Sequence, residues 1–336
     1  MKTTLKVFVI VVLITITGTR ICSQNYYAGA KVNDSWGFID KTGSWIIQPQ
    51  FDAVESFSEG MAGVKKNGNW GYIGTNGKWA IEPIYKRAED FSEGLGRVIV
   101  IQPGDDRWIY LNKEGKLAFP GQFANCQNFN EGLAGARDQN KWGYISKTGK
   151  YVIPDKFEHA EMFCDGYARV KLDDVYGFIG PDGEWVLKTG YKNLRDMHEG
   201  LAPAKGEKGW GYIDSKGKEI VPAIYEHAQA FSDGMGRVKE GSFGFVNKKG
   251  EIVIKLEYDN ARDFKEGMAA VKKGKSWGFV DKKGEMVIKP QFEESLDFCG
   301  GLAPVKSGGK WGYIDKTGTF IIKPQFEEAQ NFAAAD

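Results

Sequence analysis

The stretch KWGYIDKTGTFIIKPQFEEAQNF, residues 310–332, decides the fold, because the rest of the chain repeats it. When Trp311 is numbered as position zero, an aromatic residue recurs at that position at steps of 33 to 38 residues. A period of this length indicates tandem structural repeats. The nine residues at position zero are Trp36, Trp70, Trp108, Trp142, Tyr176, Trp210, Phe243, Trp277 and Trp311.

The residues after position zero predict a buried β-strand. Position +1 is Gly in every unit except the third, which has Ile109; an aromatic residue follows at +2 and an aliphatic one at +3. Apolar residues on both faces of a strand indicate burial, and the Gly leaves room for a neighbouring backbone or ring. We therefore expect the rings at positions zero, +2, +15 and +21 to form the core.

The remainder of each unit predicts further short strands joined by turns. A turn such as Asp315-Lys316-Thr317-Gly318 ends in Gly in all nine units, and a second apolar strand follows it. Seven of the nine units close on an acidic residue and Gly, as at Glu59-Gly60, before an alternating strand leads to the next unit. No segment has the period of an amphipathic helix, so the sequence predicts an all-β fold.

We expect one repeat domain over residues 24–336, made of short antiparallel strands and hairpins. A unit this small cannot bury its own aromatic face, so neighbouring units must stack. Propellers usually have four to eight blades, and the two ends of this chain show no sign of a shared blade. These points favour an open superhelical solenoid, with a propeller-like ring as the alternative. The units are 27–60, 61–94, 95–132, 133–166, 167–200, 201–234, 235–267, 268–301 and 302–336.

The pattern at residues 310–332 resembles the WG repeat of bacterial proteins, and the resemblance covers residues 27–336. It implies an all-β repeat array, often secreted or associated with the cell envelope, and it implies no catalytic residues. The expected role is an interaction scaffold.

The N-terminus predicts export. Lys2 and Lys6 precede an apolar run from Val7 to Ile16, and small and polar residues follow as far as Ser23. This pattern is typical of a signal peptide, here residues 1–23, and it is short for a membrane span. Acylation of Cys22 is the alternative, but Thr19-Arg20-Ile21 does not match a lipobox, so we expect no lipid anchor there. The mature chain is expected in the periplasm, at the outer membrane or outside the cell, without a transmembrane span.

Composition excludes several function classes. The net charge is +1 and the charges are interspersed, so nothing suggests nucleic-acid binding. Three cysteines (Cys126, Cys164 and Cys299) remain after the signal peptide, too few and too scattered for a disulfide framework. No phosphate-binding loop, nucleophile elbow or dinucleotide fingerprint occurs. We expect no enzyme activity and no cofactor.

The candidate chemical groups occupy ordinary repeat positions. His159 and His227 share position +17 two units apart, which disfavours a metal site. Cys164 and His198 share position +22 in adjacent units, so stacking could bring them together as a dyad, but Ser, Asn and Lys fill that position elsewhere. The acidic residues at +23 suggest paired carboxylates, yet a carboxylate that recurs this often is better explained as a turn former. A calcium site is the alternative for turns such as Asp40-Lys41-Thr42-Gly43, but one carboxylate per loop in most units disfavours it.

Two irregular features are the candidates for a binding surface. Position +9 carries aromatic rings in five units and aliphatic or acidic residues in the others, and such rings could stack on sugars or anchor a protein. The alternative is that these rings cover a neighbouring unit. An insertion at residues 102–107 marks a loop of the kind that repeat proteins use for binding. We expect a protein or cell-envelope partner, or in the alternative a glycan or peptidoglycan, at Trp45, Trp79, Tyr151, Trp185 and Phe320.

Overall fold

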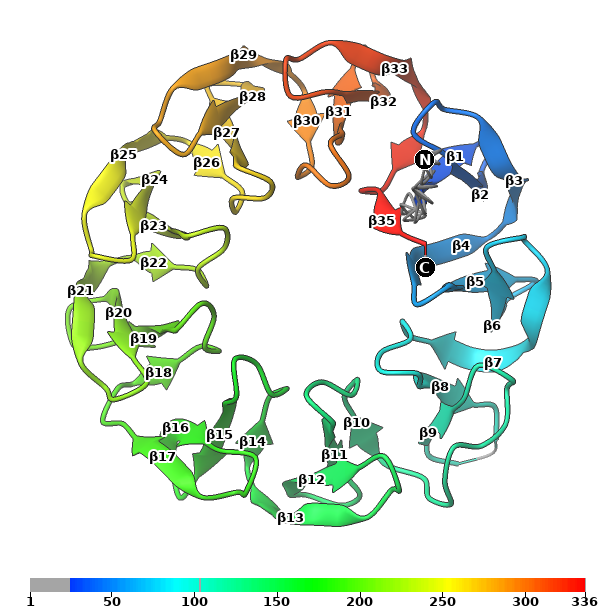
Figure 1. Ribbon diagram of the computed structural model, residues 1–336, viewed down its shortest axis with the longest axis vertical. Coiled ribbons are helices and arrows are strands. Elements are labelled where there is room, and N and C mark those ends of the chain that lie inside the picture. The colour runs from blue at the N-terminus through cyan, green and yellow to red at the C-terminus, as the bar shows by residue number, and fades with distance from the viewer. Residues whose placement is uncertain (1–24, 103, 336) are drawn as a thin grey trace, which may run out of the picture.

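The chain forms a closed ring of β-sheets around a central opening (Figure 1). The structure, a computed structural model, describes residues 25–102 and 104–335. Regular structure in these residues is entirely β, with no helix, so no helix among them is long and apolar enough to cross a membrane. The sheets are small and antiparallel, and the architecture is an eight-bladed β-propeller. The predicted all-β repeat fold is confirmed.

Six sheets have four strands, ordered from the central opening outward. They are β10 (Asn125–Cys126), β11 (Leu133–Arg137), β12 (Trp142–Ser146) and β13 (Tyr151–Phe157); β14 (His159–Ala160), β15 (Ala168–Leu172), β16 (Val175–Ile179) and β17 (Trp185–Lys188); β18 (Asn193–Leu194), β19 (Leu201–Lys205), β20 (Trp210–Asp214) and β21 (Glu219–Tyr225); β22 (His227–Ala228), β23 (Met235–Glu240), β24 (Ser242–Asn247) and β25 (Ile252–Tyr258); β26 (Asn260–Ala261), β27 (Met268–Lys273), β28 (Ser276–Asp281) and β29 (Met286–Phe292); and β30 (Glu294–Ser295), β31 (Ala303–Ser307), β32 (Lys310–Ile314) and β33 (Phe320–Phe326).

The other two sheets are larger. One has six strands, in the order β4 (Ala53–Ser58), β5 (Met61–Lys66), β6 (Asn69–Gly74), β7 (Trp79–Ala88), β8 (Gly96–Val100) and β9 (Trp108–Leu111). The other joins the two ends of the chain through β3 (Trp45–Phe51), β2 (Ser35–Ile39), β1 (Tyr26–Val32), β34 (Glu328–Ala329) and β35 (Ala333–Ala334). The long strand β7 lies in the second unit and pairs with β6 of that unit on one side and with β8 of the third unit on the other, so eight sheets accommodate nine units.

Each unit supplies the innermost strand of the next unit's sheet. In the fourth unit, His159 and Ala160 at +17 and +18 pair with Lys171 and Val170 of the fifth. The last unit does the same across the ends of the chain, because Glu328 and Ala329 pair with Lys31 and Ala30.

The preference for an open solenoid was therefore wrong, and the propeller-like ring is confirmed. The expectation that the ends share no blade was also wrong. Two hydrogen bonds close the ring, from Glu327 N to Lys31 O and from Gln330 N to Gly29 O, each of 2.9 Å. An unpaired edge on β1 would leave backbone groups without partners, and the last residues of the chain cover it. This closing strand is only two residues long, so no run of apolar residues marks it in the sequence.

The Gly at position +1 is required by a β-bulge. The register shifts between Trp311 and Tyr313, which brings the backbone of β33 over Gly312. A Cβ on Gly312 would lie 2.5 Å from the Ile322 carbonyl oxygen, closer than atoms can approach. The expected close approach at this Gly is thus made by the backbone of the outermost strand.

The third unit shows what happens without this Gly. Ile109 occupies position +1, and no fourth strand forms there. Only isolated bridges, Leu111 to Leu117 and Trp108 to Phe123, replace it. A side chain at +1 excludes the bulged outer strand, as the steric argument requires.

The core consists of one apolar cluster for each pair of adjoining units. The rings at +2 and the apolar residues at +21 are fully buried; for example, Tyr144 and Phe163 make an edge contact with centroids 4.9 Å apart. The rings at +15 are buried in eight units, with Tyr191 partly exposed, whereas most residues at position zero are only partly buried. The predicted core positions hold, with position zero at its margin.

Candidate functional sites

The aromatic residues at +9 lie on the outermost strands and pack against the preceding unit. Trp79 contacts Phe51 edge-on with centroids 6.0 Å apart, and Trp45 contacts Phe326 across the chain ends at 5.8 Å. Trp185 and Phe320 make the same contact with Phe157 and Phe292. These four rings are partly buried, and Tyr151 is 37% exposed. They follow the rim one per unit and do not converge on one site.

The acidic residues at +23 form hairpins that project toward the central opening (Figure 1). Glu93 and Gly94 both have positive φ, 54° and 85°, as in a type I′ turn. A non-Gly residue in this conformation is strained, which needs compensation elsewhere.

Hydrogen bonds between units supply that compensation. The Glu59 carboxylate accepts a bond of 2.8 Å from Gly94 N in the next unit, and the same bond recurs along the ring. In the other units the carboxylates that accept the corresponding bond belong to Glu93, Glu131, Asp165, Glu199, Asp233 and Glu266. The turn-former interpretation therefore accounts for these carboxylates.

Lysines at position +5 reinforce this series from two units away. Lys282 Nζ lies 2.6 Å from an oxygen of Asp233, and Lys147 Nζ lies 3.1 Å from Glu93. Burial opposes ionisation of Asp233, but the hydrogen bonds from Lys282 and Gly267 N together keep the pKa of its carboxyl below the usual value. The carboxylates thus hold neighbouring hairpins together and are not poised for acid–base catalysis.

Cys164 and His198 are the one candidate pair that stacking brings together. The Sγ atom lies 3.5 Å from Nδ1. Elsewhere the +22 side chain donates to a carbonyl of the next unit, as Ser92 Oγ does to Phe129 O at 2.6 Å. Burial, together with Asp165 and Glu131, raises the pKa of the Cys164 thiol, whereas a nucleophilic cysteine needs a lowered one. The pair therefore occupies a structural position.

The remaining thiols and histidines do not form a centre. Burial raises the pKa of Cys126 to about 11 and also raises that of Cys299, and all three cysteines are free. His159 and His227 are exposed on separate inner strands. Within residues 25–102 and 104–335, no group of three or more His, Cys, Asp or Glu side chains is placed to hold a metal ion.

The insertion is tied to its neighbours at its C-terminal end. Asp106 forms an ion pair of 2.7 Å with Lys86, and Arg107 forms one of 2.8 Å with Asp138. These contacts hold the described part of the loop against adjoining strands.

A set of polar side chains on the inner side of the ring was missed by the sequence analysis. Arg97, Arg169 and Arg237 share position +27 and recur in every second unit, and each donates to a side chain near the end of its own unit. Arg169 Nε donates to Asp196 at 2.8 Å, and Arg237 Nε donates to Asp263 at 2.9 Å. The sequence did carry a signal for this set: Arg alternates with small residues at position +27, and the residue at position +20 varies between units.

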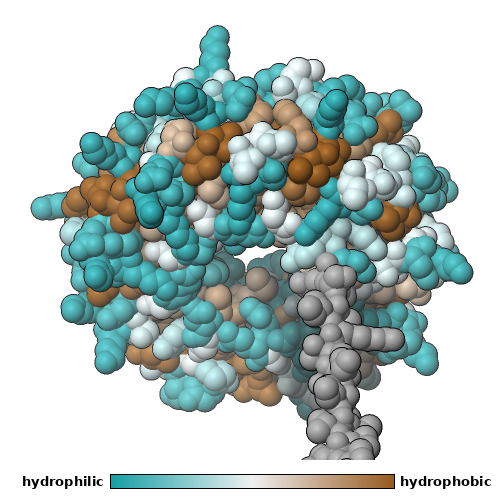
Figure 2. All heavy atoms as spheres, turned by 45° about the horizontal axis from the view of Figure 1, so that its top comes forward, coloured by the Kyte–Doolittle hydropathy of each residue, from teal (hydrophilic) through white to brown (hydrophobic). Residues whose placement is uncertain are grey.

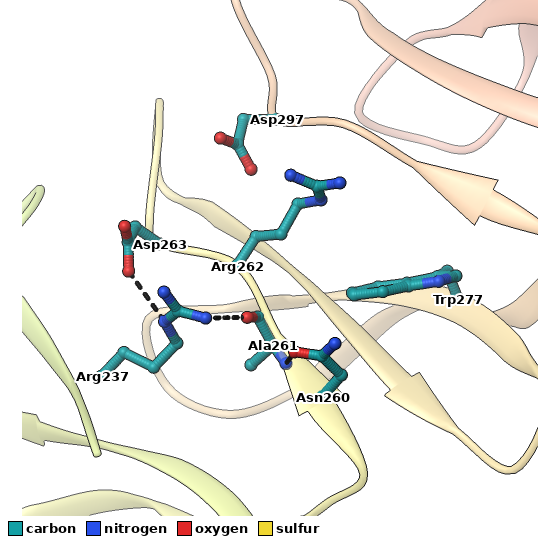
Figure 3. A pocket seen from close by; sticks show the side chains of 7 residues that line it. All are labelled: Arg237, Asn260, Ala261, Arg262, Asp263, Trp277 and Asp297. Carbon is teal, nitrogen blue, oxygen red and sulfur yellow. Dashed lines mark hydrogen bonds and ion pairs between the residues drawn. The ribbon is translucent and has the colours of Figure 1, made fainter. Parts of the chain in front are cut away.

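Beside Arg237 the inner side is hollowed. A pocket of about 250 Å³ lies there between the seventh and eighth units, and Figure 3 shows the side chains that line it. It contains two arginines, two aspartates and Trp277. It is polar and holds charges of both signs.

The comparisons with known proteins agree with the repeat and the ring. The family described as "WG containing repeat" matches nine consecutive segments: 36–70, 70–100, 108–142, 142–176, 176–206, 210–242, 243–276, 277–311 and 311–334. No curated protein matches the chain.

Two solved structures show the fold. One, described as the crystal structure of the eukaryotic initiation factor, is 10% identical with a TM-score of 0.68, over 92% of this chain and 98% of that chain. The other, dihydro-heme d1 dehydrogenase NirN in complex with DHE, is 10% identical with a TM-score of 0.51, over 93% of this chain and 75% of that chain. At such low identity the likeness concerns the fold alone.

Proposed function

Since the chain belongs to the WG-repeat family, we propose that it is an exported, non-enzymatic scaffold that binds a protein or another component of the cell envelope. The export part rests on residues 1–23. These residues, which include Cys22, lie outside the part of the chain that the structure describes. The scaffold part rests on how the repeat uses its chemically active side chains.

Those side chains serve contacts between units. The carboxylates at +23 bond to the next hairpin, Cys164 and His198 occupy a stacking position, and the three thiols have raised pKa values. No charge or nucleophile among them is left to act on a substrate. This use of the side chains supports a role in binding through the protein surface.

The observation that carries the proposal is a row of exposed apolar side chains on the outer rim. Ile46, Val152, Val186, Val287 and Ile321 all occupy position +10 and are between 41% and 50% exposed. Figure 2 shows such hydrophobic side chains interspersed with hydrophilic ones on the outer surface, with an opening in the middle. Apolar groups that recur around a rim suit contact with a protein partner.

Glycan or peptidoglycan binding through the +9 rings is the second candidate. Tyr151 is 37% exposed and could stack on a sugar. Trp45, Trp79, Trp185 and Phe320 are engaged edge-on by the preceding unit, which leaves less ring surface for a ligand. This contact favours the protein partner.

A cross-linking co-purification tests the proposal. Mature chain starting at residue 24 is incubated with envelope fractions of its own organism, cross-linked and recovered. We expect a defined protein partner, and we expect Val152→Lys with Val186→Lys to reduce its recovery at least about tenfold, since lysine ammonium groups cannot be desolvated there cheaply. The matched control adds the same charge at Gln139 and Asn140, two exposed loop residues.

Two results decide against the proposal. Equal recovery with the rim and control variants would show that the rim is not the contact surface, and retention of polysaccharide alone would favour the glycan. In that case a Trp45, Trp79 and Trp185 triple alanine variant, checked by thermal unfolding, must lose the polysaccharide.

A further inference from the structure

The pocket between the seventh and eighth units is only half satisfied. On one side Arg237 donates to Asp263 and to the Ala261 carbonyl, and Figure 3 draws both bonds. On the other side Arg262 and Asp297 extend toward each other, and Figure 3 draws no hydrogen bond or ion pair between them. The buried Nε of Arg262 has no acceptor, and the buried Oδ1 of Asp297 has no donor.

Unpartnered buried polar atoms destabilise a fold, by about 1–3 kcal/mol each. Some buried oxygens at equivalent positions also lack a donor, such as Asp90 Oδ1 and Asn331 Oδ1 at +20, but this pocket places an unpartnered N–H and an unpartnered carboxylate oxygen together. An N–H donor and a carboxylate acceptor that face one pocket without partners indicate that a group from outside the chain completes them.

The junction between the fifth and sixth units provides the internal comparison. Arg195 occupies the same position, +19, as Arg262, and each guanidinium lies over the Trp of the following unit, at 4.8 Å for Trp210 and 5.7 Å for Trp277. Arg195 donates to the side-chain oxygen of Gln229, the +19 residue of the next unit. The residue that corresponds to Gln229 beside Arg262 is Leu296, which has no acceptor.

The arginine at +19 thus has a carboxamide as hydrogen-bond acceptor between the fifth and sixth units, and it lacks that carboxamide between the seventh and eighth units. We propose that the pocket between the seventh and eighth units binds a carboxamide, such as the side chain of glutamine or asparagine on a partner peptide. Its carbonyl oxygen accepts from Arg262, and its NH₂ group donates to Asp297, the two roles that an amide combines.

Charge and burial exclude other small ligands. Two arginines and two aspartates line the pocket, so its formal charge is zero and an anion would meet two carboxylates. Trp277 is 8% exposed beneath Arg262, so its ring face is not open for stacking on a sugar. A neutral group with one acceptor and one donor fits, and the volume of about 250 Å³ accommodates it.

This site goes beyond the proposed function, since it concerns the inner side of the ring and a defined chemical group. The test uses the purified mature chain and N-acetyl-glutamine amide as the probe. We expect millimolar probe to shift the indole N–H resonance of Trp277, identified with Trp277→Phe, with a dissociation constant on the order of 1 mM for so small a ligand.

The decisive variant is Leu296→Gln, which supplies the carboxamide that Gln229 provides at the other junction. We expect it to weaken probe binding at least about tenfold, since the pocket is then filled from within. Arg262→Leu removes the donor and is the second variant, in case Leu296→Gln does not fold. The control, Ile252→Gln, places the same side chain on the exposed rim and should bind the probe like the wild type.

Three results overturn the proposal: no shift in the wild-type chain, unchanged binding in both pocket variants, or an equal shift with methyl glucoside, which carries hydroxyls and no amide. A crystal soaked with probe that shows only water between Arg262 and Asp297 does the same. None of these results depends on the rim experiment, so this site and the scaffold function can fail separately.

Discussion

Replacement of Phe332 by alanine tests whether the ring is closed. Phe332 is 1% exposed, and its cluster combines Tyr313 of the last unit with Ala28 and Ala30 of the first. Removing a buried phenylalanine costs about 3–5 kcal/mol. Since a domain is stable by about 5–15 kcal/mol, this loss is readily measured by urea unfolding.

Phe298 is the matched control. It occupies the same position, +21, is 2% exposed and contacts Phe279 of its own unit at 5.0 Å, compared with 4.9 Å between Phe332 and Tyr313. In a closed ring the two alanine variants should lose the same stability within about 1 kcal/mol. In an open array Phe332 would still contact Tyr313, but it would have no contact with Ala28 and Ala30 of the first unit and would lie at an exposed end of the array.

A cost below about 1 kcal/mol for Phe332→Ala, with the full cost for Phe298→Ala, would refute the closure. A second measurement follows the seam directly. Deletion of residues 327–336 should accelerate hydrogen exchange in β1, since the pairing of β34 and β35 with β1 is lost and this edge of β1 becomes open to water. Unchanged protection of β1 would contradict the pairing.

Four further predictions concern the ring contacts. Tyr144→Phe should cost about 1 kcal/mol in urea unfolding, because its hydroxyl donates to the Glu161 carbonyl at 2.7 Å; a neutral result would mean that water replaces it. Asp233→Asn should make the free energy of unfolding fall less steeply on acidification. The pKa of Asp233 is lower in the folded state than in the unfolded state, so its carboxylate stabilises the fold at pH values above the unfolded-state pKa. That stabilisation is lost as the pH falls through the folded-state pKa. Asp297→Asn should have the opposite effect, because burial raises the pKa of Asp297 in the folded state, and the wild-type chain therefore loses stability as the pH rises above the unfolded-state pKa. Thermal melts from pH 3 to 8 check both signs. Melting temperatures that change with pH in the variants as they do in the wild type would contradict both predictions. Cys164 should react with a thiol reagent more slowly than free cysteine at neutral pH, and fast labelling would contradict its raised pKa.

The sequence predicted the interior of each unit well, because that interior is local and repeated. The alternation from Trp311 to Ile314 identified the buried strand, and the fixed spacing identified the rings at +2, +15 and +21 as core. Every copy reports the same environment, so nine copies average out individual exceptions. Ile109 was visible as such an exception, although its effect, the missing outer strand, required the bulge geometry.

What the sequence did not predict depends on contacts between units. Closure rests on two strands of two residues each, β34 and β35, which are too short to show a strand pattern. The pocket arises because Arg262 meets Leu296 where Arg195 meets Gln229, and this pairing is visible only once the register between units is known. The +9 rings were identified from variation alone, which does not distinguish a binding surface from a contact with the preceding unit.

The exchange of inner strands has a consequence for biosynthesis. The first unit is translated first, yet the strand that completes its sheet, β34, lies within the last ten residues. Each later unit takes its innermost strand from the unit before it, which has already been made, but the first unit must wait until β34 has been translated. A chain halted before residue 328 would therefore expose the β1 edge to pairing with other chains, which makes the time between first and last residue the period of greatest risk of aggregation.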